Sequence, residues 1–294
     1  GNPNAAFILR QAEVPPPYAG DTTTATAQAQ VTAYNSTTDI ATLTIQFEST
    51  SFTESLVQVG DLIRLNHQGR WMEIATETPA TPSVTTAVDL SQGGALPWPD
   101  SNWSAPVPYE IMRQPRATSV AAPLQLPTPV VIDLFYSGMD PLDLSGFPSD
   151  SSGNTWLFGT TLATDATDPM VLFSPNGSLD VVYFDSGGVS EPRQATTPVY
   201  VLIGTNERVH QPGFSGYTSG NEPQIEDELP NWVVPISKWI SVSPQTGVIT
   251  TEQNRYYGLD ALPGGFDWND ATTWAEEIYN ARTYAREAQN MGGR

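Results

Sequence analysis

The 294-residue sequence contains no cysteine and only two histidines, which removes several classes of functional site. A chain without cysteine has no disulfide, no thiolate metal site and no cysteine nucleophile. His67 and His210 lie far apart in the sequence, so they do not match the common zinc sites. No Gly-x-Ser-x-Gly nucleophile motif accompanies either of them, and we interpret both as ordinary surface side chains. Neither residue type therefore points to an enzyme.

Basic residues are scarce. Lys238 is the single lysine, and 12 basic residues stand against 32 acidic ones, for a net charge of −20. Between Arg116 and Arg193 there is no basic residue, while nine acidic residues fall there. A surface this negative repels nucleic acid and anionic membranes, so the charge excludes both as partners. It would attract divalent cations, although solubility is the simpler interpretation.

Long hydrophobic runs are also missing. No apolar run reaches the roughly 20 residues that a membrane-spanning helix needs, and no signal peptide precedes Gly1. Gly1-Asn2-Pro3-Asn4 is a poor natural start, so we expect the protein to continue before it. Membrane attachment would then depend on that preceding segment.

The residues that are present favour a mainly β protein. Charged residues make up only 15% of the chain, and the 23 glycines and 26 prolines supply many turns. The segment 41–47 alternates between apolar and polar residues, with Leu43, Ile45 and Phe47 on one face. Further strand patterns follow it, so we expect a β-rich block over about 28–115 that forms either a lobe or an insertion.

Two hairpins are predicted in the C-terminal half. Apolar arms flank the turn at Pro175, Asn176 and Gly177, where we expect the positive φ angles of a primed turn at the last two residues. A similar turn, with Pro244 and Gly247, follows the apolar strand 239–242. The pattern indicates a mainly antiparallel β fold with long loops.

One helix is predicted, at about 271–290. Apolar residues recur there at helical spacing in a narrow, alanine-rich stripe, accompanied by two arginines. Two alternatives remain open, because the stripe suits packing against the chain's own sheet or against a neighbouring subunit. In the second case the arginines would meet an acidic neighbour. The predicted interface residues are Trp274, Ile278, Ala281, Ala285, Arg282 and Arg286.

Carboxylates offer one metal hypothesis. Asp140, Asp143 and Asp150 lie in a loop rich in Gly, Ser and Asp, and oxygen-rich loops can bind Ca²⁺. None of them matches an EF-hand, so a solvated loop is the favoured interpretation and no other cofactor is predicted. Spacing alone does not identify a glycosidase pair among 32 carboxylates. A single Asp185-Ser186-Gly187 lacks the second aspartate that an aspartic protease requires.

Aromatic residues suggest a different class of function. Trp98, Trp103 and Tyr109 lie in one proline-rich stretch and would suit a carbohydrate platform, although aromatics in β proteins more often fill cores. An extracellular carbohydrate-binding or carbohydrate-acting β protein is therefore the alternative function.

The hairpin sequence Phe173 to Ser178, followed by an apolar strand, resembles the signature hairpin of the globular domain of type II secretion minor pseudopilins and other pilin-like proteins. The stretches 59–64, 240–247 and 281–294 resemble large bacterial proteins of this kind. The resemblance implies a β-sandwich-like head on a helical stalk, displayed outside the cell, and assembly without catalysis. The family's N-terminal apolar helix is absent from this sequence.

From this resemblance we expect a single pilin-like domain over 1–294 at the bacterial cell surface. The expected function is that of a non-enzymatic structural subunit of an extracellular filament or a secretion-linked assembly. Its partners would be further copies of itself and other surface or secretion proteins. We expect contacts near the chain ends, including strand addition by Ala5 to Leu9, because two acidic middle segments would repel each other.

Overall fold

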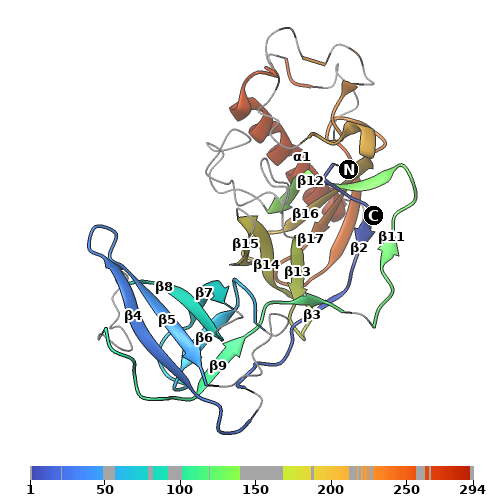
Figure 1. The fold of residues 1–294 in the computed structure, drawn as a ribbon. Coiled ribbons are helices and arrows are strands. Elements are labelled where there is room, and N and C mark those ends of the chain that lie inside the picture. The colour runs from blue at the N-terminus through green and yellow to red at the C-terminus, as the bar shows by residue number, and fades with distance from the viewer. Residues whose placement is uncertain are drawn as a thin grey trace. The chain divides into compact units, whose positions relative to one another are not determined.

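The computed structural model has two compact units, and Figure 1 shows both as ribbons. Unit 1 comprises Gly1–Arg10 and Ala122–Arg294, and unit 2 comprises Gln11–Ala121. The β-rich block expected over about 28–115 lies within unit 2. Strands make up 44% and helices 9% of the described residues, which confirms the mainly β class with antiparallel sheets and a C-terminal helix. The structure describes residues 2–20, 22–48, 57–78, 82–91, 101–118, 120–139, 168–186, 189–211, 217, 220, 222–223, 225, 228–255, 262–264 and 266–291.

Unit 2 is built around an antiparallel sheet, six-stranded within the described residues, with the strand order β4-β5-β8-β7-β6-β9. A short ribbon of β3 and β10 accompanies it. The strands are β3 (Ala12–Glu13), β4 (Ala27–Asn35), β5 (Ile40–Phe47), β6 (Leu62–Leu65), β7 (Met72–Thr78), β8 (Ser83–Asp89), β9 (Tyr109–Met112) and β10 (Arg116–Ala117).

The first and last strands of this sheet are joined through the segment before β9. Ala27 and Val107 exchange two backbone hydrogen bonds, of 2.8 and 2.9 Å, and the Ser104 amide donates to the Ala29 carbonyl at 2.9 Å. These bonds satisfy backbone groups of β4 that would otherwise face solvent at an edge. The sheet therefore closes on itself as a barrel.

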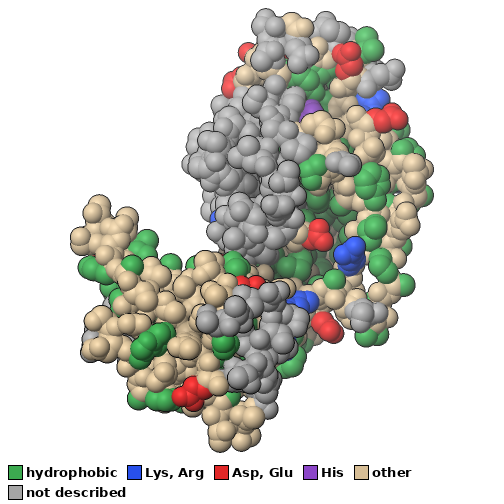
Figure 2. All heavy atoms as spheres, in the orientation of Figure 1, with side chains coloured by type: hydrophobic (Ala, Val, Ile, Leu, Met, Phe, Trp, Pro, Cys, Tyr) green, Lys and Arg blue, Asp and Glu red, His purple; other side chains and the backbone are tan. Residues whose placement is uncertain are grey.

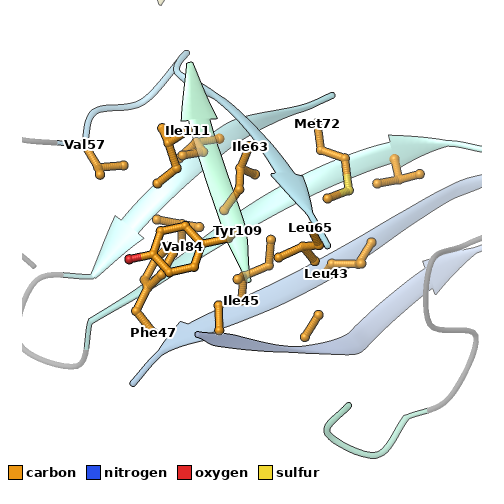
Figure 3. Packing of buried hydrophobic residues seen from close by; sticks show 14 of the residues in the cluster. Leu43, Ile45, Phe47, Val57, Ile63, Leu65, Met72, Val84, Tyr109 and Ile111 are labelled. Atoms are coloured by element: carbon orange, nitrogen blue, oxygen red, sulfur yellow. The ribbon is translucent and has the colours of Figure 1, made fainter. Parts of the chain in front are cut away.

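The barrel interior is apolar. Leu43, Ile45 and Phe47 are buried, as the alternation predicts, and in Figure 3 they point into the same interior as Ile63 and Ile111. Every second residue of the strands thus enters one core, while the intervening residues face outward.

Asp61 lies within the stretch 59–64 and follows Gly60, which has a φ of +88°. Its buried carboxylate accepts hydrogen bonds of 2.8 Å from the amides of Gln58 and Gln114. Burial raises the pKa of Asp61. The carboxylate therefore has a structural role, since it ties the turn before β6 to the segment after β9.

In the described part of unit 1, five strands form a sheet in the order β1-β12-β16-β17-β18, and three form a sheet in the order β13-β14-β15. The remaining elements are a two-stranded ribbon, a short 3-10 helix and the C-terminal helix. The elements are β1 (Ala5–Ala6), β2 (Ile8–Leu9), β11 (Leu124–Gln125), β12 (Val130–Met139), β13 (Met170–Phe173), β14 (Leu179–Ser186), β15 (Val189–Gln194), β16 (Val199–Thr205), η1 (Asn206–Arg208), β17 (Lys238–Val242), β18 (Ile249–Gln253) and α1 (Ala271–Met291).

The five-stranded sheet forms the middle layer of unit 1. Tyr200 and Leu202 of β16 belong to the core cluster that contains residues of α1. Val199, which alternates with them, packs instead with Val182 and Phe184 of β14. The sheet therefore carries the helix on one face and the three-stranded sheet on the other, and both of its faces are covered by apolar contacts.

Candidate assembly surface

The turn between β13 and β14 is a tight hairpin. The Gly177 amide donates to the Ser174 carbonyl at 2.8 Å, and the Ser174 amide donates to the Ser178 carbonyl at 2.9 Å. Gly177 has a φ of +91°, which a glycine adopts without steric cost. Asn176 does not share the positive φ, so the turn is not the primed type expected from the sequence. The Asn176 side chain instead accepts a hydrogen bond from the Ser178 amide at 3.0 Å.

The two predicted Ser-Pro turns lie side by side. The Leu179 amide at the first turn donates to the Pro244 carbonyl at the second, at 3.0 Å. A Cβ atom at Gly247 would collide with the carbonyl oxygen of Gly177, so only glycine permits this close approach. Sequence reasoning treated the turns as separate features, because nothing local indicates that one packs against the other.

Three exposed apolar side chains surround the joined turns, and we call them the apolar tip surface. Phe173 is 48% exposed, Val248 47% and Ile249 61%. Phe173 lies close to Gly247, with its Cδ1 atom 3.6 Å from the position that a Cβ would occupy there. Figure 2 shows hydrophobic side chains exposed at several places on unit 1. Exposed apolar groups gathered at one place are typical of interaction surfaces.

The apolar tip surface adjoins an open sheet edge. Within the described residues, β18 pairs only with β17, so no described strand pairs with its other side. Such an edge accepts a strand from another chain unless something covers it. Ile249 is the first residue of β18, so the exposed apolar side chains and the free edge meet at the same end of the strand.

The opposite edge of the sheet is covered by the N-terminal segment. Ala5 and Ala6 pair with β12, and the Asn2 and Asn4 side chains donate to the His210 carbonyl at 3.1 and 3.2 Å. Ile8 and Leu9 pair with β11. The expectation that Ala5 to Leu9 adds to another subunit's sheet is therefore wrong for this arrangement, because these residues are already paired within their own chain.

The predicted interface on α1 also needs correction. Trp274, Ile278, Ala281 and Ala285 are buried in the core of unit 1, so they are not available to a neighbouring subunit. The sequence left open whether the stripe packs against the chain's own sheet or against a neighbouring subunit. In the structure it packs against the chain's own sheet. Arg286 is exposed and stays a predicted contact residue.

Arg282 is buried as well, which sequence reasoning missed. Its guanidinium donates to the Met139 carbonyl at 2.8 Å and the Tyr136 carbonyl at 2.5 Å, and it lies over the rings of Tyr200 and Trp239. The β12–β16 pairing shifts register between Asp133 and Gly138, so the Tyr136 carbonyl falls in an irregular part of the ladder. A buried carbonyl there requires a donor, and Arg282 supplies one.

Asp133 stabilises the start of the same irregular segment. Its buried carboxylate accepts hydrogen bonds from the Asn231 side chain at 2.9 Å and the Phe135 amide at 3.1 Å. Asn231 also exchanges hydrogen bonds of 2.8 and 3.1 Å with the backbone of Thr205. Burial raises the pKa of Asp133 to about 7, since its partners only partly compensate for lost hydration.

His210 is not the surface side chain that the sequence suggested. Its Nδ1 atom hydrogen-bonds the Tyr136 hydroxyl at 2.5 Å, and its Nε2 atom hydrogen-bonds the Tyr217 hydroxyl at 3.1 Å. The ring also stacks near Trp274, with centroids 5.9 Å apart. Burial lowers the pKa of His210 to about 3, so the imidazole is neutral at physiological pH and belongs to an aromatic core.

His67 lies in unit 2, at the turn after β6. Both Asn66 and His67 have positive φ angles, of 53° and 51°, and the Gln68 amide donates to the Leu65 carbonyl at 3.1 Å. His67 Nδ1 is 3.7 Å from a Glu110 carboxylate oxygen, which also accepts a 2.7 Å hydrogen bond from Arg64. That bond lowers the pKa of Glu110. His67 is therefore an exposed neighbour of the Arg64–Glu110 ion pair.

The remaining predicted sites are not assembled in the described residues. Asp140, Asp143, Asp150 and Trp98 lie outside them. Among the residues that are described, no group of three metal-binding side chains comes together. Tyr109 is buried inside the barrel and so cannot belong to an exposed aromatic platform.

In the described ranges, no helix combines the length and the hydropathy that crossing a membrane requires. No family model, curated protein or solved structure matches the chain.

Proposed function

We propose that this protein is a non-enzymatic structural subunit of a pilin-like or secretion-linked assembly at the bacterial cell surface. Copies of the chain, and other subunits of the same assembly, would associate through the apolar tip surface and the open edge of β18. The observation that carries the proposal is the exposure of Phe173, Val248 and Ile249 at one end of an open edge strand. The hairpin sequence 173–178, which resembles that of minor pseudopilins, supplies part of this surface.

The distribution of charged residues also supports association at the apolar tip surface. The segments 170–179 and 239–251, which carry both turns, contain no charged residue, although the net charge of the chain is −20. Two copies brought together through acidic segments would repel each other, whereas contact through the tips sets no like charges face to face. Association at this surface would therefore be driven by apolar burial and strand pairing and would depend weakly on salt.

Ile249→Asp tests the proposal in the full-length chain. We expect the wild-type protein to associate as its concentration rises, measured by size-exclusion chromatography with light scattering and by electron microscopy. A buried aspartate without a partner should weaken that association by about tenfold or more. Ile236→Asp is the matched control, because Ile236 is 67% exposed and precedes β17 at the far end of the β17–β18 hairpin.

The control should associate like the wild-type protein. A wild-type chain that stays monomeric at high concentration and shows no assembly by microscopy would contradict self-assembly. Assembly that Ile249→Asp leaves unchanged would contradict the proposed surface but not the structural role.

A further inference from the structure

The outer face of the unit 2 barrel is uncharged at the central positions of three neighbouring strands, and Asp89 ends β8 on this face. Unit 2 contains 11 acidic residues and four arginines, yet none of them lies at the central outward positions of β4, β5 and β8. Figure 2 shows the visible side of this unit covered largely by uncharged polar side chains and backbone. We call this surface the neutral face, and its residues are Gln28, Gln30, Thr32, Thr42, Thr44, Gln46, Ser83, Thr85 and Ala87.

The neutral face is regular. Gln28, Gln46 and Ser83 lie opposite one another on adjacent strands, and so do Gln30, Thr44 and Thr85. Adjacent strands are about 4.8 Å apart, so these rows present amides and hydroxyls at even intervals. Hydroxyls and amides each donate and accept hydrogen bonds and carry no charge.

A tryptophan borders the neutral face. The segment from Ser101 to Val107 runs beside β4, because the Gln28 side chain donates to the Ser104 carbonyl at 3.2 Å and that of Gln30 donates to the Ser101 carbonyl. Trp103 belongs to this segment and is 42% exposed. Trp103 is therefore an exposed aromatic residue of the segment that borders this array of neutral hydrogen-bonding groups.

We propose that the neutral face and Trp103 bind a neutral polysaccharide. Sugar hydroxyls both donate and accept hydrogen bonds, which matches the amides and hydroxyls of the face. The apolar side of a sugar ring would pack on the indole, whose large surface contributes strongly to such contacts. No ion on the face would lose hydration on binding, whereas an anionic polymer would be repelled by the acidic chain. This site is separate from the apolar tip surface and does not depend on the proposed assembly.

Affinity electrophoresis of the full-length protein tests the inference. The acidic chain migrates in native gels, which would contain a soluble β-glucan, xylan, galactomannan or, as the anionic control, alginate. We expect at least one neutral polymer to retard the protein and alginate to leave its migration unchanged. Trp103→Ala and Thr44→Glu should each weaken binding by about tenfold, which corresponds to about 1.4 kcal/mol.

Two variants serve as matched controls. Tyr34→Ala removes an exposed aromatic ring from β4, and Thr37→Glu adds a carboxylate at the exposed β4–β5 turn. Both should be retarded like the wild-type protein, and unchanged circular dichroism would show that all four variants fold. Because Thr44 is an outward position, Thr44→Glu keeps the test decisive if Trp103→Ala does not fold.

Three results would overturn the inference. They are no retardation by any of the neutral polymers, equal retardation of the face variants and their controls, and retardation by alginate alone. A change of oligomeric state in Thr44→Glu without polysaccharide binding would assign the face to contact between copies instead.

Discussion

The two units of this protein have cores of different kinds. The barrel of unit 2 is filled mainly by aliphatic side chains that alternate along its strands, such as Leu43 and Ile45. The core of unit 1 contains Trp232, Trp239 and Trp274 together with buried polar groups. The comparison shows that the side chains that fill the first core follow a local pattern. The second core also contains buried polar side chains whose burial no local pattern indicates.

Arg282→Ala should have the largest effect, and it acts on unit 1. It removes the donor to the Met139 and Tyr136 carbonyls and leaves a cavity between aromatic rings, so we expect a loss of about 3–5 kcal/mol of unfolding free energy. Urea denaturation measures it. Arg286→Ala, on the exposed side of the same helix, should cost less than about 0.5 kcal/mol. Equal effects of the two variants would refute the burial of Arg282.

Ile45→Ala tests the apolar core of unit 2. Deleting this fully buried side chain should cost about 2–4 kcal/mol through lost burial and the cavity that remains. Hydrogen exchange resolved by peptide should show faster exchange in Gln11–Ala121 and unchanged exchange in unit 1. Thr44→Ala, at the adjacent outward position, is the control. If exchange rises equally in both units, the two cores do not unfold independently.

Gly247→Ala and Gly177→Ala compare the two joined turns of unit 1. Gly177 has open space around it, so alanine there should cost only about 1 kcal/mol for its positive φ. At Gly247 the added methyl group also meets the Gly177 carbonyl, and we expect about 2–3 kcal/mol. Thermal melts of both variants measure the difference. Equal melting temperatures would mean that the turns do not touch in solution.

The pH dependence of unit 1 should be the smallest effect. Unfolded histidine binds a proton below a pH of about 6.5. Since His210 has a folded pKa of about 3, the stability it contributes is full above 6.5 and is lost as the pH falls. Asp133, with a folded pKa of about 7, contributes stability that is full below about 3.9 and is lost as the pH rises to 7. Between a pH of about 3.9 and about 6.5, the stability contributed by His210 rises with pH, while the stability contributed by Asp133 falls.

His210→Asn separates the two contributions. The variant should lose the acid sensitivity of His210, so its stability relative to the wild-type protein should rise by about 1–2 kcal/mol between pH 6.5 and 5. Melting curves at several pH values measure this difference, in which the contributions of other groups cancel. A difference independent of pH would show that His210 is accessible and titrates normally.

The sequence by itself determined the features that depend on neighbouring residues in the chain. Leu43, Ile45 and Phe47 alternate because a strand places successive side chains on opposite faces, and this pattern was sufficient to predict β5. Trp274 and Ile278 recur at helical spacing, which was sufficient to predict α1 at about its observed bounds. Gly177 and Gly247 indicated the two turns, because few other residues adopt a positive φ at low cost.

Only the tertiary structure decided which of these elements meet. The alanine-rich stripe did not distinguish a subunit contact from a contact with the chain's own sheet, since both bury the same apolar face. Arg282 and His210 are charged or titratable types that a local pattern assigns to the surface, and their burial depends on carbonyl and hydroxyl partners more than 70 residues away, such as Tyr136. The joined turns and the closure of the barrel through Val107 likewise depend on contacts between distant segments, which no local pattern encodes.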